Sequence, residues 1–244
     1  MRDPEPVLSA DPGVAAPRRP GWVAQALFVA KKDLAIELAT GEIVTTSGFF
    51  AVLVAVIASL AFFAGQGAAE QVAPGVIWVS VAFASVLALS RTWQREREEG
   101  ALLGLLVMPI RRSAIFAGKA LGVTAFVIAV ELIVIPVAAL LFAVDLREVG
   151  AGLGLICLAA TPGVAASGTF FGAMTVRTRA RDLVLASVLF PLLAPTLLAA
   201  VAGTRELFGG AGLSELTDYM ALMAVFDVVF VAGGVGLFEL IIEG

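Results

Sequence analysis

Two carboxylic acids lie inside long apolar segments, where an ionised group is unusual. Glu131 lies near the middle of residues 120–144, and Asp227 lies in the first half of residues 219–242. Charged side chains are costly at that depth of a bilayer and normally face a protein interior or a wet cavity. Each could therefore serve a translocation path, a proton site or a contact with a polar cargo. The alternative, which we favour for both, is a hydrogen bond to a neighbouring helix that only fixes packing.

A second group of charges lies between two apolar segments, in residues 90–119. It opens with five consecutive ionised residues, which are Arg95, Glu96, Arg97, Glu98 and Glu99. Gly100 follows, and then comes an apolar run, residues 101–110, that contains Leu102, Leu105 and Leu106. Pro109 ends this run, because the residue before a proline is pushed out of the helical region. The end of the segment is basic, with Arg111, Arg112 and Lys119.

This apolar run is too short to cross a bilayer, which takes about 20 residues. We expect a short helix in a loop. Exposed apolar surface of this size usually marks a binding site, so the loop is predicted to dock a soluble partner at the membrane surface. The alternative is an ordinary solvated face, in which Arg95 and Glu99 form a common i,i+4 ion pair.

Enzymatic chemistry is not indicated. The chain has no histidine and one cysteine, Cys157, so disulfides within the chain and sites built on cysteine and histidine are excluded. There is no GxxxxGK[ST] phosphate loop and no GxSxG motif. We predict no catalytic residue, no metal site and no assigned cofactor-binding residue. If ATP drives this protein, a partner subunit must hydrolyse it.

The composition predicts an all-α integral membrane protein. Of the 244 residues, 60% are hydrophobic and 15% are charged, whereas soluble domains carry about 25% charged residues. Six segments are long enough to span a bilayer. They are residues 43–65, 72–90, 120–144, 149–176, 183–204 and 219–242. Six crossings place both termini on the same side.

Two further segments precede the first span. Residues 1–21 are rich in proline and charge and are predicted to form a disordered tail. Residues 22–40 form an amphipathic helix that we expect to lie in the membrane interface as an elbow. One face of this helix is apolar: Val23, Leu27, Ala30, Leu34 and Leu38. The alternative is an ordinary cytosolic helix that packs on another part of the protein. Residues 22–244 are predicted to form a single transmembrane domain.

The distribution of positive charge predicts the orientation. Of the 16 lysines and arginines, all but Arg147 and Arg205 lie on one side of this topology. Lysine and arginine concentrate in cytoplasmic loops. We therefore expect a multi-pass protein of the cytoplasmic (inner) membrane, with both termini in the cytoplasm.

Small residues recur in the fourth span and leave two alternatives open. Such residues let helices approach closely, either within one chain or across a dimer. The set comprises Gly152, Gly154, Ala159, Gly163, Gly168 and Gly172.

The layout resembles the permease subunits of ABC-2-type exporters, in which an elbow helix precedes six spans and the loop after the second span carries the coupling helix. That loop has an ERE-x-GxLxxLL-x-x-P-I-x-R pattern. The matching residues here are Glu96, Arg97, Glu98, Gly100, Leu102, Leu105, Leu106, Pro109, Ile110 and Arg112. The leucine after the glycine is displaced by one position from the usual register.

A narrower resemblance is to the CcmB family of heme exporter proteins of the cytochrome c maturation system. It rests on KKDLAIEL (residues 31–38), GKALGVTAFVIAVELIVIP (118–136), GTFFGAMTVRTRARD (168–182) and FPLLAPTLLAA (190–200). The resemblance covers most of the chain from Lys31 onward, and the tail lies outside it.

The CcmB resemblance implies partners and a role. The implied partners are a CcmA-type ATPase, CcmC, CcmD, the heme chaperone CcmE and a second copy of this chain, in a lipid bilayer and without nucleic acid. The implied role is ATP-dependent export of heme or its delivery to the chaperone on the outer face, with heme as cargo. Two alternatives remain: a mechanical coupler that releases heme-loaded chaperone without carrying heme, and an ABC-2 permease for another cargo.

Overall fold

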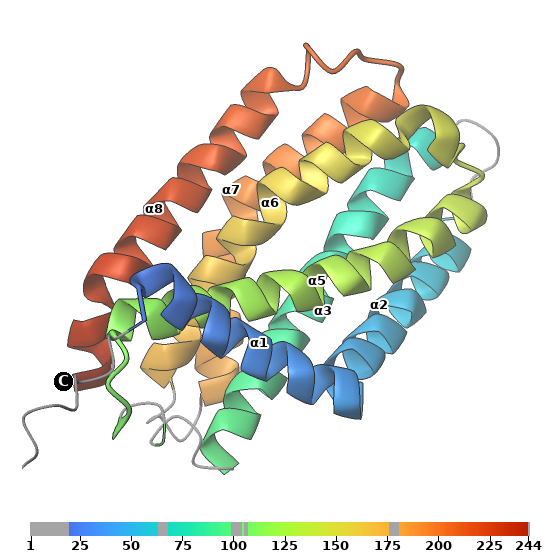
Figure 1. Ribbon diagram of the computed structural model, residues 1–244. Coiled ribbons are helices and arrows are strands. Elements are labelled where there is room, and N and C mark those ends of the chain that lie inside the picture. The colour runs from blue at the N-terminus through green and yellow to red at the C-terminus, as the bar shows by residue number, and fades with distance from the viewer. Residues whose placement is uncertain (1–19, 63–67, 99–103, 105–106, 176–180, 244) are drawn as a thin grey trace, which may run out of the picture.

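The structure is a computed structural model that describes residues 20–62, 68–98, 104, 107–175 and 181–243. These residues form long helices and, in the described part of the chain, no strand (Figure 1). The helices are α1 (Trp22–Thr40), α2 (Glu42–Ala61), α3 (Ala68–Glu98), α5 (Arg112–Phe142), α6 (Leu146–Thr175), α7 (Arg181–Phe208) and α8 (Thr217–Glu243). The predicted all-helical fold is confirmed.

Six of these helices, α2, α3, α5, α6, α7 and α8, are long and apolar enough to cross a membrane. Large apolar side chains face outward along them, including Leu60 on α2, Leu140 on α5 and Val228 on α8. A soluble protein rarely exposes contiguous apolar surface of this extent, whereas a membrane protein presents it to lipid. The chain is therefore a multi-pass membrane protein, and the residues that the structure describes supply six spans, as the sequence predicts.

Two helices continue beyond the predicted spans into residues 90–119. Helix α3 extends to Glu98, and α5 begins at Arg112. The connection between these spans is therefore shorter than the sequence indicated, and it lies between Glu98 and Arg112. The helices can continue through their charged turns because several of those side chains form ion pairs with other helices.

Helix α1 lies across the end of the bundle at which α3 ends and α5 and α7 begin (Figure 1). The C-terminal end of α8 reaches the same end. A sharp corner at Gly41 joins α1 to α2. Gly41 has φ 62°, and its N–H donates to the carbonyl oxygen of Glu37 at 2.6 Å. Glycine adopts this left-handed conformation without the cost that a Cβ imposes.

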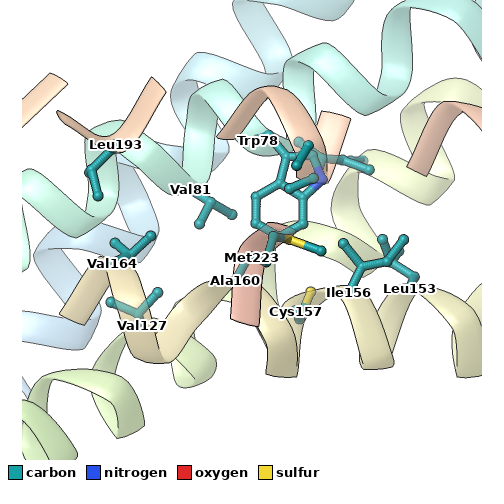
Figure 2. Close-up of a cluster of buried hydrophobic side chains, with 14 of the residues drawn as sticks. Trp78, Val81, Val127, Leu153, Ile156, Cys157, Ala160, Val164, Leu193 and Met223 are labelled. Atoms are coloured by element: carbon teal, nitrogen blue, oxygen red, sulfur yellow. The ribbon is translucent and has the colours of Figure 1, made fainter. Parts of the chain in front are cut away.

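The core is an apolar cluster shared by the spans, and Figure 2 shows part of it. Trp78 of α3 is 1% exposed, and its indole N–H donates to the hydroxyl of Thr204 on α7 at 2.9 Å. Side chains of α5, α6, α7 and α8, including Val127, Ile156 and Met223, belong to the same cluster. Helix α3 is the most enclosed span and α8 the least.

Four glycines of α6 serve packing within the chain. A Cβ at Gly152 would meet Leu207 of α7 at 2.7 Å, and one at Gly168 would meet Leu89 of α3 at 2.1 Å. Gly163 and Gly172 are similarly covered by α8 and α3. At these four glycines, the structure favours intrachain packing over a dimer face. Gly154 has open space around it.

Candidate functional site

A buried ammonium group joins three helices at the α1 end of the bundle. Lys119, near the start of α5, is 1% exposed. Its Nζ donates to Oδ2 of Asp33 on α1 at 2.8 Å and to Oε1 of Glu96 on α3. Asp33 and Glu96 are 7% and 5% exposed. A buried charge is costly unless it is paired and hydrogen-bonded, so these contacts explain how Lys119 can be enclosed.

Lys32 supplies a second positive charge to the same group. Its Nζ lies 2.9 Å from Oε1 of Glu96 and 3.1 Å from Oδ1 of Asp33. Two ammonium groups thus face two carboxylates, and the formal charges balance. Burial lowers the pKa of Lys32, but the adjacent carboxylates of Asp33 and Glu96 outweigh that effect and raise the pKa above its ordinary value. We call Asp33, Glu96, Lys119 and Lys32 the ion cluster.

Arg95 connects α3 to the corner between α1 and α2. Its guanidinium lies 3.2 Å from Oε2 of Glu42 and 3.7 Å from Oε2 of Glu37, and it donates to Oγ1 of Thr40 at 3.3 Å. Glu37 also accepts the backbone N–H of Val44 at 2.8 Å. Arg95 therefore reinforces the turn from α1 into the first span.

Helix α1 also holds the first residues of α5. The indole N–H of Trp22 donates to the hydroxyl of Ser113 at 3.0 Å, and Oε1 of Gln25 accepts the backbone N–H of Arg111 at 2.9 Å. The two helices touch closely at Gly118, where a Cβ would lie 2.5 Å from the carbonyl oxygen of Ala26. Only glycine permits this approach.

A small pocket lies beside the ion cluster. Its open volume is about 10 Å³, close to the space that one water molecule needs. Asp33, Glu96, Lys119, Arg95 and apolar residues of α1, α2 and α5 line it. Oε2 of Glu96 has no hydrogen-bond partner among the described residues. The ion cluster therefore keeps one acceptor that lacks a donor in this part of the chain.

The connection predicted to dock a partner leaves α3 just after Glu96 and enters α5 at Arg112, about two turns before Lys119. Gly104 and Val107 have helical backbone, and the chain bends at Met108 and Pro109. The side chain of Val107 is 87% exposed, that of Met108 is 42% exposed and Pro109 is exposed. Val107, Met108 and Pro109 thus face outward, whereas Ile110 packs against a buried cluster of α1, α3, α5, α6 and α8. That this connection docks a partner stays a prediction.

The other predicted residues of this loop are placed as follows. Arg112 is the first residue of α5 and is partly buried. Arg97 and Glu98 belong to the last turn of α3, and their side chains lie outside the described part of the chain. The remaining predicted residues, Glu99, Gly100, Leu102, Leu105 and Leu106, also lie outside the described residues, so their docking role stays a prediction.

Glu131 lies in the packed interior of the bundle. It is 2% exposed, and its Oε1 accepts a hydrogen bond from the hydroxyl of Thr161 on α6 at 2.7 Å. Cys157, one turn earlier on α6, also lies beside this carboxyl group. These contacts agree with the packing interpretation, because the carboxyl group links α5 to α6.

Asp227 lies against the same part of α6 from a different helix. It is half-buried on α8, and its Oδ1 covers Gly163, where a Cβ would approach to 2.2 Å. The ion cluster and Glu131 are built by different turns of the helices, so the structure does not join the two groups of predicted residues into one site. Within the described ranges, no group of three or more histidine, cysteine, aspartate or glutamate residues could hold a metal ion.

The role of Asp33 and the burial of Lys119 were not predicted from the sequence. Asp33 pairs with a residue 86 positions away, and such a pairing is not visible in one sequence. A local signal did exist for Lys119, since it stands in a long apolar helix and directly after Gly118. A lysine enclosed in this way requires an acidic partner.

Comparison with known proteins identifies the family. The model of the CcmB protein family matches residues 24–235. Heme exporter protein B of Paracoccus denitrificans is 30% identical over 165 residues, which cover 65% of this chain and 72% of that protein. The protein of the same name from Bradyrhizobium diazoefficiens is 26% identical over 203 residues, covering 83% and 90%.

A third relative, heme exporter protein B of Rhodobacter capsulatus, is 33% identical over 147 residues, covering 59% of this chain and 65% of that protein. The family match begins within α1 and ends within α8, so it includes the ion cluster, the docking connection, the spans α2 to α7 and most of α8. The chain belongs to the CcmB family.

Proposed function

We propose that this chain is the membrane subunit of an ATP-driven complex that exports heme or delivers it to a chaperone on the outer face. The proposal of heme as cargo rests on the relatives, which are named heme exporter protein B. The proposed partners are a CcmA-type ATPase, CcmC, CcmD, the chaperone CcmE and a second copy of this chain.

The observation that carries the proposal is the connection between α3 and α5. Val107 and Met108 of this connection are apolar and exposed, and both helices that support it are fixed to α1. An exposed apolar segment on a rigid base suits docking, because little ordering entropy is lost when a partner binds. We propose that the ATPase docks here, with Arg95, Glu96, Gly100, Leu105 and their neighbours as the coupling loop.

The distribution of charge supports an orientation for this end. The α1 end carries Lys31, Lys32, Arg91 and the basic residues that begin α5, whereas Arg147 and Arg205 belong to the opposite end. Lysine and arginine favour the cytoplasmic side. We propose that the α1 end faces the cytoplasm across the inner membrane, so that a cytoplasmic ATPase can reach the connection.

A second candidate function is supported by Glu131. Its burial and its hydrogen bond to Thr161 leave it facing protein and not an open path through this chain. Such packing favours a mechanical coupler, in which ATP hydrolysis moves the helices and releases heme-loaded chaperone from the neighbouring subunits. ATP-dependent accumulation of heme in proteoliposomes would favour transport, and release of chaperone without accumulation would favour coupling.

The test of docking is an affinity pull-down of this chain from membranes in mild detergent. The parent chain should recover the ATPase, and the triple variant Leu102→Asp, Leu105→Asp, Leu106→Asp should lose it while still inserting. A matched control is Leu213→Asp, because Leu213 is an exposed leucine in the connection between α7 and α8 at the opposite end. Full recovery of the ATPase by the triple variant would overturn the docking assignment.

A further inference from the structure

Lys119 stands on α5, about two turns after the docking connection, and contacts both α1 and α3. We infer that Lys119 is a positioning residue whose three-way contact makes the connection between α3 and α5 move together with α1. Of the residues in the ion cluster, it alone stands on α5 while contacting both α1 and α3. The inference rests on the proposed function only for the origin of the movement, which is the ATPase.

The contacts at each base of the connection support this inference. The α3 base reaches α1 through Glu96 and Lys32, which are 2.9 Å apart. The α5 base reaches α1 through Ser113 and Trp22, and also through Arg111 and Gln25. Lys119 links the two bases to each other and to Asp33. Displacement of either base therefore displaces α1.

Helix α1 can pass such a displacement into the membrane. The corner at Gly41 leads directly into α2, and Glu37 holds that corner through the backbone N–H of Val44 and the guanidinium of Arg95. Helix α2 packs on α3 and α5. The structure thus connects the docking site to the first span without passing through the bundle core.

A purely structural role is the alternative that the test must exclude. Lys119 could do no more than neutralise Glu96 and Asp33, since a buried carboxylate that loses its partner is strongly destabilising. The two roles differ in one respect. If Lys119 only neutralises charge, removing a carboxylate together with the ammonium group should restore the parent's behaviour. If Lys119 links the helices, removing both groups does not restore the link.

The test is a distance measurement by electron paramagnetic resonance on the full chain in lipid nanodiscs, alone and with the ATPase bound. Labels are attached through Leu38→Cys on α1 and Val107→Cys on the connection, in a Cys157→Ala background. Both labelled side chains are well exposed, at 88% and 87%. A control pair, Leu198→Cys and Val225→Cys, reports on α7 and α8, away from the ion cluster.

In the chain without further changes, the distance distribution should be narrow and should keep its width when ATP is added. In Lys119→Met it should broaden by about twofold, because the connection can then open locally from α1. The control pair should be unaffected. A distribution in Lys119→Met as narrow as in the parent would overturn the inference.

The double variant Glu96→Gln, Lys119→Met separates the two roles and guards against misfolding of the single variant. It removes one charge of each sign, and Asp33 keeps Lys32 as its partner at 3.1 Å. The inference predicts a distribution as broad as that of the single variant. Restoration of the narrow distribution would show that Lys119 only neutralises charge.

The experiments distinguish a failure of the proposed function from a failure of the positioning role of Lys119. If no ATPase is recovered with the parent chain, the docking proposal fails, but the broadening in the isolated chain still supports the contact made by Lys119. If the ATPase binds and the distribution stays narrow in both variants, docking stands and the positioning role is wrong.

Discussion

The α1 end and the middle of the bundle both bury acidic residues, but they satisfy them differently. At the α1 end, Asp33 and Glu96 meet the ammonium groups of Lys32 and Lys119. In the middle, Glu131 meets a hydroxyl and a thiol of α6, and no cation is paired with it in the described part of the chain.

This difference assigns different roles to the two regions. Ion pairs between elements fix one relative position of three helices, because each charge becomes costly when its partner moves away. A carboxyl group that bonds to a hydroxyl links two helices without charge compensation. We therefore associate the α1 end with transmission of movement and Glu131 with packing of α5 on α6.

The largest expected effect is the loss of a charge from the ion cluster. Lys119→Met should lower the free energy of unfolding by about 3 kcal/mol, because Glu96 and Asp33 must then share Lys32. Denaturant or thermal unfolding in detergent would measure the change. Lys31→Met is the matched control, since Lys31 is exposed on the same helix as Lys32, and it should change stability by at most about 0.5 kcal/mol. Equal stability of the two variants would contradict the comparison.

A smaller effect is expected where α1 crosses α5. Gly118→Ala should cost about 2 kcal/mol, because the new Cβ would meet the carbonyl oxygen of Ala26 at 2.5 Å and Cβ of Val29 at 2.6 Å, which forces the helices apart. Gly154→Ala is the control. It has open space and should be neutral or stabilising by up to about 1 kcal/mol. If the same unfolding measurement gave both variants the stability of the parent, the crossing at Gly118 would be loose.

The middle of the bundle should tolerate a neutral replacement. Glu131→Gln keeps an amide oxygen that can accept from Thr161, so its stability should stay within about 1 kcal/mol of the parent. Glu96→Gln, which weakens the pairing of Lys119, should cost more. Thermal unfolding of both variants side by side would measure this contrast, and the reverse order would show that Glu131 depends on its charge.

The smallest effect concerns pH. The carboxylates raise the pKa of Lys32 in the folded state, so its pairing contributes fully to stability below the ordinary lysine pKa of 10.5. That contribution is lost as the pH rises above 10.5 through the raised pKa. Between about pH 10 and pH 12, the melting temperature of Lys32→Met should therefore fall less than that of the parent. Parallel curves of melting temperature against pH for the two proteins would contradict this assignment.

The sequence predicts the spans well because each is a long run of apolar residues and hydropathy is local. It places the ends of the spans less well. The charges of Arg95 and Glu96 suggested that the helix ends before them and that both side chains lie in water. Instead, both residues continue α3, and they form ion pairs with α1 and α2. The expected i,i+4 partner of Arg95, Glu99, lies outside the described residues.

The ion cluster was beyond prediction because its partners come from three distant segments. Lys119 and Asp33 are 86 positions apart, and Lys32 and Glu96 are 64 apart. Residues 22–40 show a similar limit. Val23, Leu27 and Leu38 of the predicted apolar face are exposed, whereas the face that packs on α5 carries Asp33. The exposed face suits the membrane interface. The polar contacts of the other face are made with α5, so the sequence of residues 22–40 alone does not reveal them.

The most direct test of the central claim, that the α1 end is where the ATPase docks, is hydrogen–deuterium exchange of this chain with and without the ATPase. We predict protection of residues 99–110 and of α1 in the complex, and no change in the connections at 143–145 and 209–216 at the opposite end. Protection confined to those opposite connections, with residues 99–110 unchanged, would contradict the account.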